Sequence, residues 1–244
     1  MVSRRGPNGQ IVQSVPYGKK RTKKEKESSG IFGDASGLSK LIREDLRAVY
    51  GPYADGRMVN RMTTENRAVL DHGFDRETKT YHFIENSFER LQGFEFNMKS
   101  PLINSLWLRP ELTLQDGQVL VSLPELTPGT QLVFPSDTDF CTLRITVAMF
   151  ALFAGFEWYP AYLEVEVEKR QDTIPAQQWV FDLPEGCLCT AALGLSFYVS
   201  KGNVRTVYSH AGFHPAGIFG AVFRPGDFPE PDLRYWQPMH LKLA

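Results

Sequence analysis

Short apolar runs that alternate with polar residues, and that stop at turn residues, dominate the chain from about residue 79 onward. Gln118 to Leu123 alternates and stops at Pro124, and a longer run places its apolar residues on one face of a strand: Cys141, Leu143, Ile145, Val147 and Met149. Further runs of this kind lie at 81–84, 93–97, 163–167, 178–181, 188–200, 204–208 and 218–223. Many short strands at regular spacing, without alternation of strands and helices, indicate an antiparallel β-sandwich, Ig-like or similar.

One turn within this series is well defined by its residues. Lys201, Gly202 and Asn203 separate two apolar runs, 197–199 and 204–208. Because Gly and Asn tolerate positive φ, this segment predicts a β-hairpin.

A small helical part is expected before the strands. The first helix would have Asp34 as its N-cap and would end at Gly51-Pro52. Its apolar face consists of Leu38, Leu41, Ile42, Leu46 and Val49. The second helix would have Asp55 as its N-cap and an apolar side of Met58, Val59, Met62, Val69 and Leu70. Each helix has one apolar stripe, so we expect each to pack on something larger.

The sign of the charge divides the chain into an arm and a body. Residues 1–29 carry eight Lys or Arg and two Glu, a net of +6, whereas the other 215 residues carry 19 basic and 26 acidic side chains, a net of −7. Within the arm we expect coil over 1–9, a short strand over 10–15 that Pro16 closes, and a solvated basic linker over 18–29.

These segments suggest four parts. We expect a basic extended arm over 1–30, a two-helix segment over 31–78 and a β-sandwich body over 79–224, which could divide into two β subdomains near residue 135. The tail over 225–244 is rich in Pro and aromatic residues, and we expect it to lie extended over the body.

Composition restricts the class of protein. No apolar run approaches the roughly 18 residues of a membrane span. The basic N-terminus has no apolar segment behind it, unlike a signal peptide. Three cysteines imply no disulfide framework. We therefore expect synthesis in a reducing cytoplasm; the final location stays open, including an extracellular one reached without a signal peptide.

Several short motifs resemble a family of bacterial proteins of the Bacteroidota type to which no activity is assigned. The motifs lie at 20–23, 32–35, 40–43, 57–63, 93–97 and 194–198. The resemblance covers most of residues 18–223 and leaves the tail outside. It implies a basic arm rich in Gly, Lys and Arg, then two helices, then a β-rich body, and it supplies no catalytic residue.

The candidates for metal chemistry are weak. His210 and His214 are four residues apart, a spacing that suits a metal on a helix, but Gly212 and Pro215 disfavour a helix there. Cys187 and Cys189 would share a strand face, and only one other cysteine remains in the chain. Buried thiols that behave as small apolar groups are the favoured interpretation. We expect no metal site and no cofactor.

No catalytic motif is present in the sequence. Glu164, Glu166 and Glu168 line one strand face, where a solvated outer surface is more common than paired catalytic carboxylates. Aromatic residues at 153, 156, 158, 159, 235 and 236 could form a sugar or peptide platform, but are more often core or interface residues. We therefore predict that the protein is not an enzyme and has no catalytic residues.

The favoured hypothesis is a structural subunit that self-assembles into a filament, a ring or another large homo-oligomer. Its arm would bind another copy of the chain through Ile11, Val12, Val15, Lys19, Lys20, Arg21, Lys23 and Lys24. The acidic receptor face would be Glu164, Glu166 and Glu168. One alternative is nucleic-acid binding through the basic arm. Another is a carbohydrate- or peptide-binding module, or a hydrolase, on the sandwich.

Overall fold

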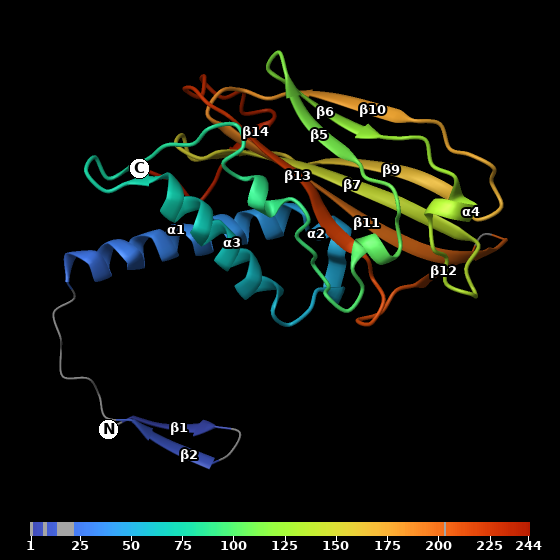
Figure 1. Cartoon of the computed structure of the whole chain (residues 1–244), viewed down its shortest axis with the longest axis horizontal. Helices are drawn as coiled ribbons and strands as arrows, with labels where there is room; N and C mark the ends of the chain where they lie inside the picture. Colours follow the sequence, from blue (N-terminus) through green and yellow to red (C-terminus); the bar gives the residue numbers. More distant parts are fainter. Residues whose placement is uncertain (1, 7–8, 14–21, 203) are drawn as a thin grey trace.

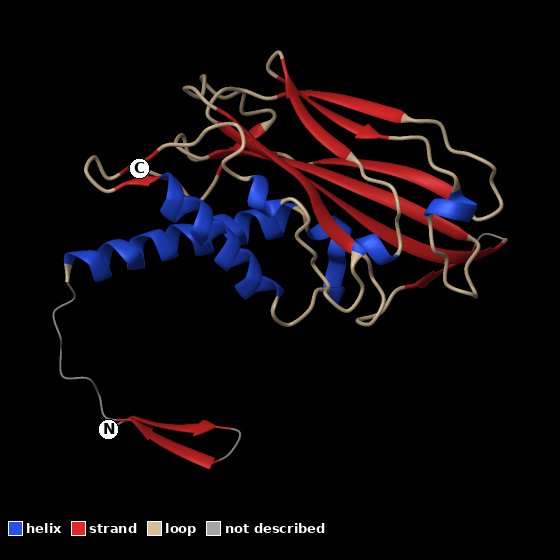
Figure 2. Ribbon diagram, viewed as in Figure 1, coloured by secondary structure: helices blue, strands red, loops and turns tan. Residues whose placement is uncertain are grey.

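The computed structural model describes residues 2–6, 9–13, 22–202 and 204–244, the first two of these ranges by their backbone alone. From residue 22 onward the elements form three layers (Figures 1 and 2). A three-stranded sheet and a seven-stranded sheet face each other, and helices cover the other face of the larger sheet. The chain is mainly β with a small helical part, and its sheets are antiparallel, which confirms the expected sandwich-like fold.

The small sheet has the strand order β10-β6-β5 and consists of β5 (Glu111–Gln115), β6 (Gln118–Leu123) and β10 (Gln177–Asp182). The large sheet contains β7 (Phe140–Ala151), β8 (Phe156–Trp158), β9 (Ala161–Glu168), β11 (Cys187–Lys201), β12 (Val204–Tyr208), β13 (Ala216–Arg224) and β14 (Trp236–Pro238). Its two long strands, β7 and β11, pair over the whole length of β7, from Cys187↔Ala151 to Tyr198↔Phe140.

The other strands attach to this pair. On one side of β11 lie β12 and β13, and on the outer side of β7 lie β9 and β8, the latter followed by β14. A short hairpin of β3 (Phe74–Asp75) and β4 (Thr80–Tyr81) follows the helices. Further helices of about one turn each are α4 (Pro128–Gln131), η1 (Gly51–Tyr53), η2 (Glu89–Leu91) and η3 (Leu102–Asn104).

Two hydrophobic cores lie on opposite faces of the large sheet. The predicted apolar face of β7, from Cys141 to Met149, is buried against the small sheet, as expected from its alternation. The intervening residues Ala148 and Phe150 enter the second core, between the large sheet and the helices. Because both faces are covered, the middle of the large sheet is apolar on each side.

The first helix begins earlier than predicted. α1 spans Lys23–Asp45, and its N-cap is Thr22, not Asp34. The hydroxyl of Thr22 accepts a hydrogen bond from the backbone N–H of Glu25, whose carboxylate accepts one from the N–H of Thr22. This capping box explains why the segment expected to be a basic linker is helical from residue 23.

The helix is interrupted at Leu46 and resumes as α2 (Arg47–Tyr50), which ends at Gly51 as predicted. α3 spans Met58–Gly73, with Arg57 instead of Asp55 at its N-cap, and Val59 is exposed rather than on the buried side. Among the residues from 22 onward that are described, no helix is long and apolar enough to cross a membrane.

Several strand predictions need correction. Residues 2–6, expected to be coil, form β1 (Val2–Gly6), and the strand expected over 10–15 is β2 (Gly9–Gln13). Only Thr80–Tyr81 is a strand in the region expected at 81–84, and the region 93–97 contributes a single bridge, Glu95↔Gly217. Strands β5, β8 and β14 were not predicted. β8 and β14 have three residues each, too few to show a period, whereas the five residues of β5 do alternate.

Gly194 sets the distance between the large sheet and the helical layer. It lies in β11, and a Cβ atom there would collide with the backbone carbonyl of Val49 at the end of α2. That carbonyl oxygen also lies 3.0 Å from Nε2 of His214, which is buried. The absence of a side chain at 194 therefore allows α2 to approach the sheet closely.

We predict that Gly194→Ala lowers the free energy of unfolding by about 1–3 kcal/mol, since the added methyl group forces α2 outward. The measurement is urea unfolding followed by fluorescence and circular dichroism. Gly33→Ala is the matched control, because Gly33 is exposed on α1 with open space around it and the change should raise helix stability. Equal stability changes in the two variants would contradict the role given to Gly194.

Candidate functional site

The N-terminal strands pair with each other. β1 and β2 form a two-stranded antiparallel sheet of their own, with Val2↔Gln13 and Gly6↔Gly9 as the end pairs. An isolated two-stranded hairpin is at best marginally stable in water and gains stability when further strands are added. Ile11 and Val12 lie in β2.

The remaining residues expected to bind a partner divide into two groups. Lys23 and Lys24 are exposed in the first turn of α1. The others, Val15, Lys19, Lys20 and Arg21, lie outside the described residues. The basic residues at the start of α1 thus connect the arm with the helical layer.

The expected acidic face is present on β9. Glu164, Glu166 and Glu168 alternate with Val165 and Val167, and all three glutamates are exposed whereas both valines are buried. Two of the three carboxylates already have cationic partners within the chain. Glu164 pairs with Arg144 at 2.7 Å and Glu166 with Arg205 at 3.2 Å. The face is therefore less negative than the sequence alone suggested.

Glu166 has the most contacts of the three. Besides Arg205, it accepts hydrogen bonds from the hydroxyls of Tyr198 at 2.6 Å and Thr142 at 2.9 Å. Burial, followed by the hydrogen bond and charge of Glu166, raises the pKa of Tyr198 to about 12. Tyr198 is therefore a hydrogen-bond donor at neutral pH. The contacts of Glu166 hold the surface side chains of β7, β9, β11 and β12 in one arrangement.

β9 is also an edge of the large sheet. It pairs with β7 on one side, and no strand of the described chain pairs with its other side. β10 is likewise an edge of the small sheet. Trp158, just before β9, contacts Phe181 of β10 with ring centroids 5.9 Å apart, so both unpaired edges lie on the same side of the sandwich.

The hydrophobic core between the two sheets is incompletely covered along that side. In β6, the inward residues Val119 and Val121 are fully buried. In β10, the corresponding Trp179 and Phe181 are only partly buried. Leu163 of β9 is also only partly buried. These aromatic and aliphatic side chains remain accessible from the open edge.

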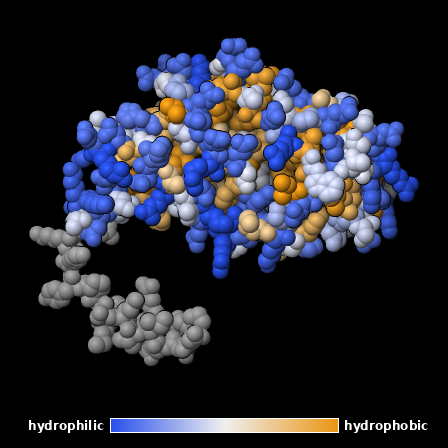
Figure 3. All heavy atoms as spheres, in the orientation of Figure 1, coloured by the Kyte–Doolittle hydropathy of each residue, from blue (hydrophilic) through white to orange (hydrophobic). Residues whose placement is uncertain are grey.

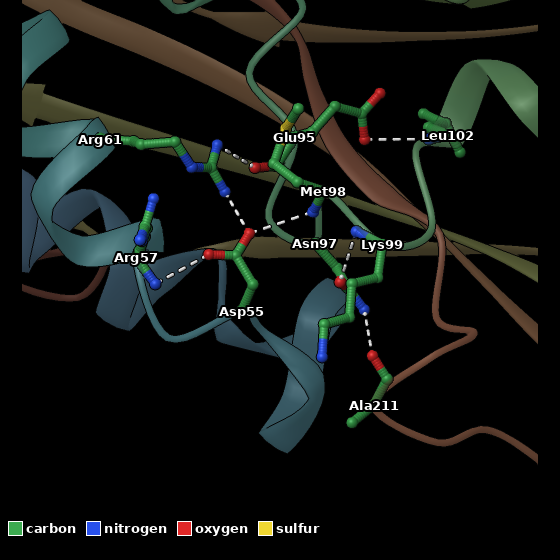
Figure 4. A network of polar contacts seen from close by, with 9 residues as sticks. All are labelled: Asp55, Arg57, Arg61, Glu95, Asn97, Met98, Lys99, Leu102 and Ala211. Carbon is green, nitrogen blue, oxygen red and sulfur yellow. Dashed lines mark hydrogen bonds and ion pairs between the residues drawn. The ribbon is translucent and has the colours of Figure 1, made fainter.

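A network that no sequence motif announced lies at the start of α3 (Figure 4). The carboxylate of Asp55 pairs with Arg61 and accepts hydrogen bonds from the backbone N–H of Arg57 and Met98. Burial opposes ionisation, but these hydrogen bonds and the Arg61 charge together lower the pKa of Asp55. Arg61 also donates to the carbonyl of Glu95 at 2.9 Å. The network fixes the loop that follows η2.

Three large apolar side chains between residues 98 and 107 are exposed. Met98, Ile103 and Trp107 are exposed over 56%, 60% and 63% of their surface. Apolar residues interrupt the hydrophilic surface over the middle of the body in Figure 3. Single exposed apolar side chains are ordinary in soluble proteins, so these residues alone define no binding site.

The two histidine candidates differ in exposure, whereas both cysteine candidates are buried in the core between the sheets. His210 is exposed, and His214 is buried beside Tyr53 with its ring nitrogens near Ser209 and Val49. Burial raises the pKa of the thiols of Cys187 and Cys189 well above the ordinary value, so both are unreactive. Across residues 22–202 and 204–244, no group of three or more His, Cys, Asp or Glu side chains could hold a metal ion.

The aromatic residues mostly serve packing. Trp158 packs against Phe181. Phe156 stacks on Phe228 with ring centroids 6.2 Å apart, and the ring centroids of Trp236 and Phe228 are 4.8 Å apart. The tail therefore folds back on the sandwich, and β14 pairs with β8, in agreement with the expected extended course over the body. Tyr159 and Tyr235 are exposed.

One carboxyl group has a strongly altered pKa. Burial raises the pKa of Asp45 to about 7, and the nearby charges of Glu157 and Glu44 add to the effect. Its Oδ2 atom is buried without a hydrogen-bond partner. Asp45 ends α1 and Glu157 belongs to β8, so this repulsion acts between the helices and the large sheet.

We predict that Asp45→Asn stabilises the protein at pH 8 by about 1–2 kcal/mol. Because the folded-state pKa is raised, the wild type loses stability as pH rises from about 4 to about 7. The gain should therefore vanish near pH 4. Thermal and urea unfolding across this range measure it, with Glu111→Gln as the control, because Glu111 is an exposed acid on β5 that is not among the charges acting on Asp45. A gain that is independent of pH would contradict the assignment.

Comparisons of the chain with protein-family models, with curated proteins and with solved structures find no match. They leave the resemblance drawn from the short motifs without further support.

Proposed function

We propose that the protein is a non-enzymatic structural subunit that assembles with copies of itself through its N-terminal arm and the edges of its sandwich. The observation that carries the proposal is the hairpin of β1 and β2, which forms a separate two-stranded sheet instead of joining a sheet of the body. Such a hairpin gains stability when it adds to another sheet, and an edge strand provides unpaired N–H and C=O groups for that purpose.

The opposite charges of the arm and the body favour contacts between copies of the chain. The arm has a net charge of +6 and the rest of the chain a net charge of −7. Opposite charges accelerate encounter and orient the partners, although each exposed pair contributes little to affinity. When the arm of one copy binds the body of the next, the contact is head-to-tail. It yields a ring if the rotation closes and a filament if it does not.

A positively charged arm also suits nucleic acid, and this is the second candidate. The acidic body opposes it, since seven excess negative charges would repel the phosphate backbone. A gel shift at low and moderate salt separates the two functions. A salt-sensitive shift of DNA or RNA by the full chain, without self-assembly, would favour the second candidate.

We predict that a chain shortened to residues 22–244 is a folded monomer, whereas the full chain forms large homo-oligomers. Both hydrophobic cores and the capping box of Thr22 lie in the retained part, so the fold should persist. Multi-angle light scattering and negative-stain electron microscopy measure the assembly, and circular dichroism verifies the fold. The same oligomer from the shortened and the full chain would refute the proposed role of the arm.

The charged segment can be tested apart from the strands. Replacing Lys19, Lys20 and Arg21 with Gln keeps β1 and β2 and removes three positive charges. We expect assembly to proceed about tenfold more slowly at low salt but to reach the same particles, because steering changes the association rate more than the final contact. Time-resolved light scattering follows the rate. An unchanged rate at low salt would contradict electrostatic steering.

A further inference from the structure

We infer that the unpaired edge of β9 receives the β1–β2 hairpin of a second copy of this chain, which would extend the seven-stranded sheet across the interface. The inference rests on the proposed function and specifies its contact surface. It concerns one edge among several, and the choice of edge follows from length, charge and burial.

Length and charge distinguish β9 from the other exposed edges. β9 has eight residues, compared with six in β10 and five in β12, and each arm strand has five. β9 contains three glutamates and no basic residue, β10 contains one acid, Asp182, and β12 contains Arg205. A basic arm with Arg4 and Arg5 in β1 is complementary to the glutamates of β9, whereas the only charged residue of β12 is the cation Arg205.

Ion pairs within the chain occupy two of the three carboxylates of β9 and leave the third for a partner copy. Glu164 and Glu166 are held by Arg144 and Arg205, whereas no contact within the described residues engages the exposed carboxylate of Glu168. Glu168 ends β9, next to Lys169, whose backbone N–H donates to Asp139. Glu168 is therefore the carboxylate of β9 that an incoming arginine can engage, although the basic residues Lys169 and Arg170 follow it directly.

Burial supplies the second argument. A strand added beside β9 would lie over the open side of the sandwich, where Leu163, Trp179 and Phe181 are only partly buried. Covering this apolar surface is favourable in proportion to its area. Backbone hydrogen bonds to the edge would supply further stabilisation, and the side chains would set the register. The edge of β9 thus offers pairing groups, apolar surface and charge in one place.

Charge reversal tests the choice of edge. We expect Glu168→Lys to weaken assembly of the full chain about tenfold at low salt, with the effect reduced in high salt. The matched control is Glu111→Lys, an exposed acid at the start of β5 on the opposite side of the sandwich, which should leave assembly unchanged. Replacing Arg4 and Arg5 with Glu should weaken the wild type and partly restore the Glu168→Lys variant.

Disulfide trapping tests proximity directly. The three native cysteines are buried, so introduced thiols report alone. Ser3→Cys protein is mixed with Glu168→Cys protein and oxidised, and a covalent dimer of the two variants is expected. Gln178→Cys, on the competing edge β10, replaces Glu168→Cys in the control mixture, where we expect no such dimer.

The outcomes separate the two proposals. In one outcome, residues 22–244 fail to assemble, but Glu168→Lys behaves like Glu111→Lys and Ser3→Cys links to Gln178→Cys or to neither site. This outcome overturns the inference about β9, while arm-mediated assembly stands. If the shortened chain still assembles, or the full chain is a monomer, both fail. Dependence on the arm and on Glu168, with trapping at 168, supports both.

Discussion

The antiparallel pair of β7 and β11 is the contact on which the remaining structure depends. The two strands pair from Cys187↔Ala151 to Tyr198↔Phe140, and both of their faces are buried along much of this length. One face forms the core of the sandwich and the other forms the core under the helices. Because the pair serves both cores, a change in its register would move every side chain to the wrong layer.

The same arrangement produces the open edge. On the side of β11, β13 is covered by β5, whose Leu112 lies against Gly220. On the side of β7, the sheet ends with β9, and the small sheet ends with β10 above it. The cores are complete near the centre and incomplete at this margin, while the chain carries a separate hairpin at its N-terminus. An unfilled edge and an unattached hairpin in one chain are the physical basis for the proposed assembly.

The sequence predicted the features that depend on local alternation. The buried face of β7, the hairpin between β11 and β12, and the end of α2 at Gly51 follow from neighbouring residues alone. Thr22 and Glu25 also form a recognisable capping box, but the surrounding lysines favoured a linker. The region 93–97 alternates like a strand, and its backbone makes three hydrogen bonds with β13, but Glu95↔Gly217 is an isolated bridge and no strand forms.

Contacts between distant residues could not be predicted in this way. Arg144 and Arg205 neutralise two glutamates of β9, and neither pairing is visible before the strand order is known. Asp45 meets Glu157 only because α1 ends against β8, and the separate hairpin depends on β1 pairing within the arm. The three glutamates are exposed on β9 as expected from their alternation, while the net charge of this face was overestimated.

Amide hydrogen exchange of the full chain, compared between dilute and concentrated solution, tests the central claim most directly. Addition of the hairpin to the edge of another copy should protect the amides of β1, β2 and β9 together as concentration rises, while the amides of β7 and β11 stay equally protected throughout. Protection of β1, β2 and β9 that does not change with concentration, in a chain that remains monomeric, would contradict the account.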